Sequence, residues 1–130
     1  MKRTIALLLA LVMVFALCAC SKKTEPTPTD NATESDYRVA MITDYGDITD
    51  QSFNQTTYEA CKAFCEENSI DFTYYKPAGD NTPDRIAMVE KAVDEGYNVI
   101  VMPGFAFAGT ISGTQDQYPD VKFIALDVSE

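Results

Sequence analysis

The chain has 130 residues, 20 acidic against 10 basic side chains, a net charge of −10 at pH 7, four cysteines and no histidine. This negative charge argues against nucleic acid and anionic lipid as partners, because their phosphates repel an acidic protein. Without histidine, neither a catalytic triad nor a zinc site of the usual composition can be assembled.

The N-terminal segment has the features of a secretory signal: two basic residues, an uncharged apolar run from Ile5 to Ala19, and then Cys20. The run is shorter than the roughly 20 residues of a membrane-spanning helix, so we expect its removal. Its end, "LCAC", resembles the bacterial lipobox, in which the cysteine is acylated and becomes the first mature residue. We therefore predict a signal peptide at 1–19 and a lipidated Cys20. The alternative is a plain signal peptide with an unrelated cysteine.

The segment after Cys20 contains no large apolar side chain up to residue 36 and has two prolines spaced by threonines. Such a composition cannot bury enough surface to offset the entropy of ordering the chain. We predict a disordered tether at 20–36 that holds a folded lobe, 37–130, away from the membrane. The predicted location is the extracytoplasmic face of the cell membrane, with the lipid as anchor.

The folded part alternates strand and helix patterns. Short segments rich in Val, Ile, Phe and Tyr predict strands at 37–43, 70–76, 98–103 and 121–127. Helical patterns occupy the connections at 52–68 and 82–96, with a shorter helix expected within 107–120. This alternation predicts an α/β fold with a parallel sheet, whose ligands gather at the carboxyl ends of the strands. The chain stops close after the last strand, so we expect a longer parent protein.

The helix ends carry recognisable signals. Ser52 and Gln55 offer a capping box for the first helix, with Asp50 as an alternative cap. Thr82 is the expected cap of the second helix, and Gly96 its stop. Helical spacing predicts core faces formed by Phe53, Thr57, Cys61, Phe64 and Cys65 in the first helix and by Ile86, Val89 and Val93 in the second. The two cysteines are interpreted as small buried apolar residues rather than as a disulfide.

The loop after the first strand, "TDYGDITDQSFN", contains three aspartates. Counted from Asp44, the EF-hand positions 3, 5 and 12 hold Gly46, Ile48 and Gln55, so the calcium pattern fails. The aspartates could serve as general acid and base, but the sequence gives no means of assigning partners. A phosphate cradle is disfavoured, since the loop has one glycine, no lysine and three carboxylates.

A neutral ligand rich in hydroxyl groups fits the loop better. Carboxylates and amides pair with hydroxyls, and Phe53 with the phenylalanines of "GFAF", Phe105 and Phe107, can cover a flat ring. Both of these phenylalanines are expected to wall the cleft, and which one faces the ligand is open. No metal and no other cofactor is predicted.

The stretch "MITDYGDITDQSFNQTTYEA" resembles the N-terminal signature of the basic membrane protein family, the nucleoside-binding lipoproteins of ABC transporters. Gly46 followed by Asp47 and Ala60 in place of a common glycine are mild departures from it. The resemblance continues through "GFAF" and "FIALD", covers 37–130 and agrees with the lipobox. It implies a lobe of the type I periplasmic-binding-protein fold.

The resemblance also implies roles for individual residues. Asp44 would hold ribose hydroxyls, Phe53 would stack on the base, Asn54 would reach the ribose, and Asp127 would accept hydrogen bonds from a purine edge. Each has a structural alternative: Asp44 could only end its strand, Phe53 could be core, Asn54 could brace the first helical turn, and Asp127 could cap a following helix. Asp47 and Asp50 are interpreted as structural.

The predicted function is nucleoside binding, with purine nucleosides favoured, for uptake by an ABC permease and its ATPase, without chemistry on the ligand. Members of this family have two lobes that close on the ligand, so one lobe alone should bind weakly or not at all. Three other functions stay open: binding of a sugar or similar signal, a sensory or antigenic role, and, with less support from the residues, nucleoside hydrolysis.

Overall fold

The computed structural model describes residues 36–129. The predicted signal peptide, Cys20 and the tether up to residue 35 lie outside the described residues. Across 36–129, no helix has both the length and the apolar character needed to cross a lipid bilayer.

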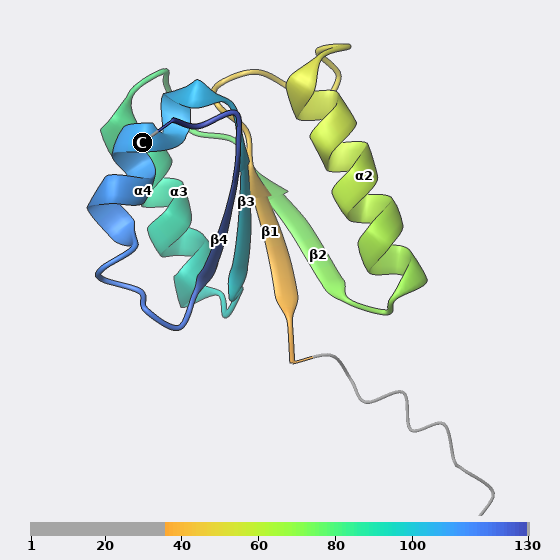
Figure 1. Ribbon diagram of the computed structural model, residues 1–130. Helices are drawn as coiled ribbons and strands as arrows, with labels where there is room; N and C mark the ends of the chain where they lie inside the picture. Colours follow the sequence, from red (N-terminus) through yellow and green to blue (C-terminus); the bar gives the residue numbers. More distant parts are fainter. Residues whose placement is uncertain (1–35, 130) are drawn as a thin grey trace, which may run out of the picture. The chain divides into compact units, whose positions relative to one another are not determined.

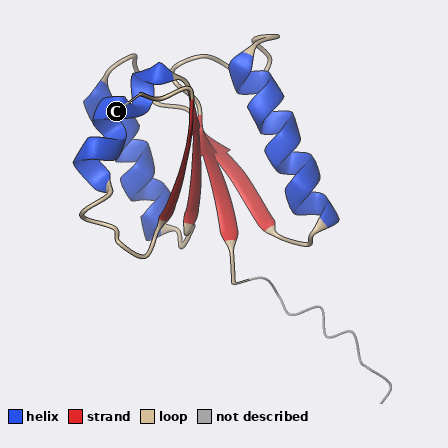
Figure 2. Ribbon diagram, in the orientation of Figure 1, coloured by secondary structure: helices blue, strands red, loops and turns tan. Residues whose placement is uncertain are grey.

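Four parallel strands form one sheet in the order β2-β1-β3-β4 (Figures 1 and 2). The strands are β1 Arg38–Ile42, β2 Asp71–Tyr75, β3 Val99–Pro103 and β4 Lys122–Leu126. Each lies inside its predicted segment, so the predicted parallel α/β fold is confirmed. The fold follows from the sequence because short runs of β-branched and aromatic residues alternate with helical patterns. Each helix then connects one strand to the next as a crossover, and strands joined in this way run parallel.

The helices cover the two faces of the sheet: α2 packs on one face and α3 with α4 on the other (Figure 1). Their bounds are α2 Phe53–Glu67, α3 Thr82–Asp94 and α4 Ala108–Thr114, with a 3-10 turn η1 at Phe105–Phe107 before α4. All three predicted helices are therefore present. Helices on both faces follow from the chain reversing direction across the sheet, from β2 on one side of β1 to β3 on the other.

Side chains alternate between the two faces along each central strand, as the pleat requires. The larger core lies under α3 and α4 and is built on Ala40, Ile42, Ile100 and Met102 together with Val89, Ala92 and Phe107. The smaller core lies under α2, where Val39 and Val101 contact Cys65. Both faces of β1 and β3 are thus apolar, which matches their nearly unbroken apolar sequences.

The first helix is capped by Asp50 rather than by the Ser52 capping box. Ser52 stands at the N-cap position without a side-chain hydrogen bond. Asp50 Oδ1 instead accepts hydrogen bonds from the backbone N–H of Ser52 (2.8 Å) and of Gln55 (3.1 Å). The capping-box prediction is wrong because the Gln55 side chain accepts from the N–H of Gln51 at 2.9 Å; the alternative cap is confirmed.

The cap of α3 also lies one residue earlier than predicted. Asn81 Oδ1 accepts a hydrogen bond from the N–H of Asp84 at 2.9 Å, so Thr82 is the first helical residue and not the cap. An asparagine amide oxygen satisfies the exposed N–H groups of a first turn as well as a threonine hydroxyl does. The predicted stop is confirmed, because Gly96 has a φ of +86° in the left-handed region that favours glycine.

The predicted core face of α2 is only partly buried. Thr57 and Cys65 are enclosed, but Phe53 is 40% and Phe64 58% exposed. The reason is an apolar groove of about 450 Å³ between α2 and the β3–β4 side of the sheet. Its wall on the helix includes Phe53, Ala60, Cys61 and Phe64, and its floor includes Val99, Val101, Ile124 and Leu126. We call this feature the α2 groove.

Cys61 and Cys65 are free thiols in partly and fully buried positions, which confirms their interpretation as small apolar residues. Burial raises the pKa of Cys61 to about 11. Its thiol is therefore protonated at neutral pH and is a poor nucleophile. We expect alkylation of Cys61 by iodoacetamide to be slow at pH 7.5 and to accelerate as pH rises toward 11, as followed by peptide mass spectrometry. Rapid modification at pH 7.5 in the folded protein would contradict this burial.

Candidate ligand-binding site

The sheet order places a topological switch point between β1 and β3. The chain continues from β1 to β2 on one side, and later enters β3 on the other side of β1. The connections that leave β1 and β3 therefore lead to helices on opposite faces, and the space between two such connections at the carboxyl edge is where ligands of open α/β sheets bind. The loop after β1 begins at Thr43 and includes Asp44, and the turn after β3 begins at Gly104.

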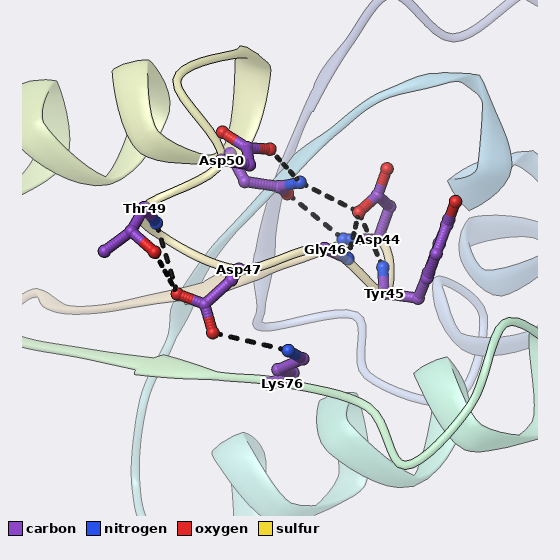
Figure 3. A network of polar contacts seen from close by, with 8 residues as sticks. Asp44, Tyr45, Gly46, Asp47, Thr49, Asp50 and Lys76 are labelled. Carbon is purple, nitrogen blue, oxygen red and sulfur yellow. Dashed lines mark hydrogen bonds and ion pairs between the residues drawn. The ribbon is translucent and has the colours of Figure 1, made fainter.

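Asp44 is the centre of a hydrogen-bond network in the loop after β1 (Figure 3). Its Oδ1 accepts hydrogen bonds from the N–H of Tyr45 (2.6 Å), the N–H of Gly46 (2.7 Å) and Nδ2 of Asn54 (2.9 Å). Its Oδ2 makes no hydrogen bond to any residue of the described range 36–129 and points away from the loop in Figure 3. One oxygen thus fixes the carboxylate, and the other is available to a ligand.

The pKa of the Asp44 carboxyl is lowered from its usual 3.8. Partial burial acts to raise it, but the N–H groups of Gly46 and Tyr45, the amide of Asn54 and the charge of Arg85 together outweigh that effect. Hydrogen bonds to the charged form favour ionisation. Asp44 therefore stays a carboxylate at neutral and mildly acidic pH, where it accepts hydrogen bonds and does not donate them.

Asn54 lies in the first turn of α2 and is 4% exposed. Its Nδ2 donates to Asp44 Oδ1 and to Asp50 Oδ2, each at 2.9 Å, and its Oδ1 accepts from the N–H of Asp44 at 3.3 Å. Both amide hydrogens are thereby used inside the loop. These bonds brace the loop against α2, and the predicted contact of Asn54 with a ribose stays a prediction.

Gly46 is required by this network. A Cβ atom on residue 46 would lie 2.6 Å from Asn54 Nδ2 and 3.2 Å from Asp44 Oδ1. Atoms cannot approach so closely, so any larger residue would push the Asn54 amide away from Asp44. The single glycine of the loop is thus explained by close packing of side chains against its backbone.

Asp47 and Asp50 have the structural roles that were predicted for them. Asp47 Oδ1 accepts from the hydroxyl of Thr49 at 2.9 Å, and its Oδ2 pairs with Lys76 Nζ at 3.3 Å (Figure 3). Asp50 caps α2 through Oδ1 and holds Asn54 through Oδ2. Of the three aspartates, only Asp44 has a carboxylate oxygen without a hydrogen bond or ion pair to another residue of 36–129.

The aromatic candidates divide by burial. Phe105 is 80% and Phe53 40% exposed, whereas Phe107 is fully buried in the core. Because a ring enclosed on all sides cannot cover a ligand, Phe105 is the exposed candidate of the two, and its contact with a ligand stays a prediction. Phe107 belongs to the core because the 3-10 turn rotates it under α3 and away from the edge.

Asp127 follows β4 and is exposed, with a φ of +58°. Aspartate tolerates this left-handed conformation better than most residues, and such conformations are common at functional sites. Asp44 and Asp127 belong to strands separated by β3, so two strand spacings of about 4.8 Å place the strands that carry them roughly 10 Å apart along the edge. The N–H of Gly104 donates to the carbonyl of Leu126 at 2.8 Å and ties the turns after β3 and β4 together.

Sequence reasoning missed Arg85, which is 4% exposed and contacts this loop from α3. A signal existed, because Arg85, Val89 and Ala92 share the helical spacing of one buried face. A cation on such a face indicates a buried partner. No cluster of three potential metal-ligating side chains occurs in the part of the chain that the structure describes.

Comparison with known proteins identifies the family. Residues 37–129 match the family described as ABC transporter substrate-binding protein PnrA-like (Bmp). The chain is 28% identical over 134 residues to a CD4+ T-cell-stimulating antigen of Listeria innocua, covering 97% of this chain and 37% of that protein. It is 26% identical over 131 residues to the ABC transporter nucleoside-binding protein BmpA of Lactococcus lactis, covering 97% of this chain and 36% of that protein. The chain thus spans little more than a third of these relatives.

Solved structures agree on the fold. An ABC transporter solute-binding protein from Aeropyrum pernix superimposes with a TM-score of 0.64 at 23% identity, over 72% of this chain and 25% of that one. Similarity at this level of identity establishes the α/β architecture and nothing about the ligand.

Proposed function

The chain belongs to the Bmp family of PnrA-like substrate-binding proteins of ABC transporters, and from this premise we propose that the whole gene product binds nucleosides, with purine nucleosides preferred, for uptake. The family is one of substrate-binding proteins and not of enzymes, so the predicted absence of chemistry on the ligand agrees with it. An ABC permease and its ATPase are the proposed partners. Cys20 is the proposed lipid anchor on the extracytoplasmic face of the membrane.

The observation that carries this proposal is the geometry of Asp44. One of its oxygens is held by three donors, while the other has no hydrogen-bond partner among the described residues. A fixed, ionised acceptor suits a ligand with hydroxyl groups, such as a ribose. Such a site discriminates strongly against a ligand that lacks the hydroxyl, because the carboxylate would then lose its hydrogen bond.

The exposed aromatic rings support a ligand with a flat ring system. Phe53 and Phe105 stand at the same edge of the sheet as Asp44, one at the start of α2 and the other after β3. A base can stack on such rings by offset or edge-to-face contact. In this proposal Asp127, about two strand spacings from Asp44, accepts hydrogen bonds from the amino groups of a purine.

Residues 37–130 form the N-terminal lobe in this proposal, and a second lobe closes over the ligand. The relatives are nearly three times as long as the matched region, which leaves length for such a lobe in a family member. A single lobe offers one side of a clamp and buries only part of a ligand. Its affinity should be low because most of the binding surface is missing.

The direct test is calorimetric titration of guanosine, adenosine, cytidine and ribose into the whole gene product beginning at Ser21. We expect the two purine nucleosides to bind most tightly, cytidine less tightly and ribose too weakly to measure. Ribose alone is the control for the sugar-binding alternative, since it carries the hydroxyls without the base. If no nucleoside produces heat at millimolar concentration, the nucleoside assignment is wrong; if ribose binds as well as guanosine, the ligand is a sugar.

A further inference from the structure

Arg85 is a buried cation beneath the candidate site. It lies in the first turn of α3, and its side chain is 4% exposed. Lysine and arginine are almost never enclosed to this degree unless they are paired. Burial removes the guanidinium charge from water, which is unfavourable, so the contacts of Arg85 have to compensate for the lost solvation.

Three separate connections at the carboxyl edge converge on this side chain. Arg85 Nε donates to the carbonyl oxygen of Asp44 at 3.0 Å, in the loop after β1. Its Nη2 pairs with the carboxylate of Asp80 in the connection between β2 and α3. The guanidinium also lies over the ring of Phe107, with 5.7 Å between its Cζ and the ring centroid. One planar side chain thus joins the segments that follow β1, β2 and β3.

We propose that Arg85 is the positioning residue of the ligand site, which fixes Asp44 for the ligand without touching the ligand itself. This inference rests on the proposed function. Arg85 holds the backbone of Asp44 from the α3 side of the sheet, and Asn54 holds its carboxylate from α2. Asp44 is therefore held by hydrogen bonds from both α2 and α3, which lie on opposite faces of the sheet.

The chemistry of the guanidinium explains why an arginine occupies this place. Its planar fork donates in two directions at once, to a carbonyl and to a carboxylate, and its flat face packs on an aromatic ring. Lysine would supply the same charge from a single point and could not make all three contacts. The charge of Arg85 also acts on the Asp44 carboxylate. Asp50 is joined to that carboxylate through Asn54, and Asp80 is paired with Arg85 itself.

The experiment compares Arg85→Met and Arg85→Lys with Arg38→Met in the whole gene product beginning at Ser21. Arg38 is a matched control, because it is also an arginine in an ion pair, with Asp71 at 2.7 Å, but at the opposite edge of the sheet. Three quantities are measured for each variant: affinity for guanosine, its dependence on pH, and the hydrogen exchange of the Tyr45 and Gly46 amides by NMR.

We expect Arg85→Met to weaken guanosine binding by about tenfold to a hundredfold, the range for removing a hydrogen bond to a charged group. Arg85→Lys should recover part of the affinity, and Arg38→Met should change it by less than about threefold. The acid limit of binding should move to higher pH in Arg85→Met, because a cation that favours ionisation of Asp44 is gone. Circular dichroism over the same pH range distinguishes this shift from the earlier acid unfolding of a less stable variant.

Unchanged affinity and unchanged amide exchange in both Arg85 variants would overturn the proposal, as would equal losses in Arg38→Met. If Arg85→Met does not fold, the Arg85→Lys variant decides by the same measurements. If the wild-type protein binds no nucleoside, the proposed function fails and amide exchange decides the role of Arg85. Faster exchange at Tyr45 and Gly46 in the Arg85 variants alone then supports positioning, and unchanged exchange excludes it.

Discussion

Asp44→Asn is expected to weaken the binding of guanosine to the whole gene product by about tenfold to a hundredfold, the cost of losing a charged acceptor. Asparagine has nearly the same shape, and its remaining oxygen can still accept from Tyr45, Gly46 and Asn54, so the loop should keep its conformation. The change replaces the free Oδ2 with an amide donor at the place where a ribose hydroxyl donates. Calorimetric titration measures the loss.

Two comparisons make this result specific. Asp47→Asn is the matched control, because Asp47 lies in the same loop and carries the same charge but is bonded to Thr49 and Lys76. It should change affinity by less than about threefold, as expected for an exposed ion pair. The second comparison is a thermodynamic cycle, in which guanosine and 2′-deoxyguanosine are each titrated into the wild-type protein and into Asp44→Asn. If Asp44 holds ribose hydroxyls, the variant discriminates less between the two ligands; equal discrimination in both proteins would remove Asp44 from the ribose site.

Gly46→Ala is expected to damage the site nearly as much, although residue 46 contributes no side chain to it. The new methyl group would lie 2.6 Å from Asn54 Nδ2, so the amide has to move and release Asp44 Oδ1. We expect a loss of affinity of about tenfold or more and a destabilisation of about 1–3 kcal/mol, the cost of a broken buried hydrogen bond. Guanosine titration and urea unfolding measure the two effects.

Gly79→Ala provides the control for this substitution. Its added methyl group would lie 2.8 Å from Asp84 Oδ2, which is nearly as short as the contact made by the methyl group of Gly46→Ala. Here, however, the contacted atom is the end of a flexible side chain near the start of α3. That carboxylate can rotate away, so guanosine affinity should not change. If Gly46→Ala binds guanosine as tightly as Gly79→Ala does, the close packing of Asn54 is not required for the site.

The fold could be predicted from the sequence because each strand and helix is specified by a short local pattern, and the strand–helix pattern repeats along the chain. The strand at Val99–Pro103, for example, is a run of apolar residues between Gly96 and Gly104, which gives both its type and its limits. The caps were predicted less well, since Asp50 competes with Ser52 and Asn81 with Thr82 for adjacent N–H groups. Neighbouring residues of equal capping ability differ only in backbone geometry, which a sequence does not display.

The site was predicted in part. Asp44, Asp127, Phe53 and Phe105 lie at the predicted edge because strand ends fix their positions. Phe107 and Phe105 could not be separated, since a 3-10 turn decides which ring enters the core. Arg85 follows Asp44 by 41 residues, and a contact over that distance depends on how the layers pack and not on any local pattern. The ligand contacts themselves remain predictions.

The α2 groove has a mechanical consequence for this site. Helix α2 is supported along its β2 flank, where the ring of Tyr58 packs against Phe72 and Tyr74 at centroid distances of 5.7 and 5.3 Å, and its other flank borders the groove. A 15-residue helix is about 22 Å long, so each degree of tilt about its far end shifts its first turn by about 0.4 Å. Phe53 and Asn54 belong to that first turn. A small tilt of α2 over the groove would therefore displace both residues, and Phe53 itself lines the groove.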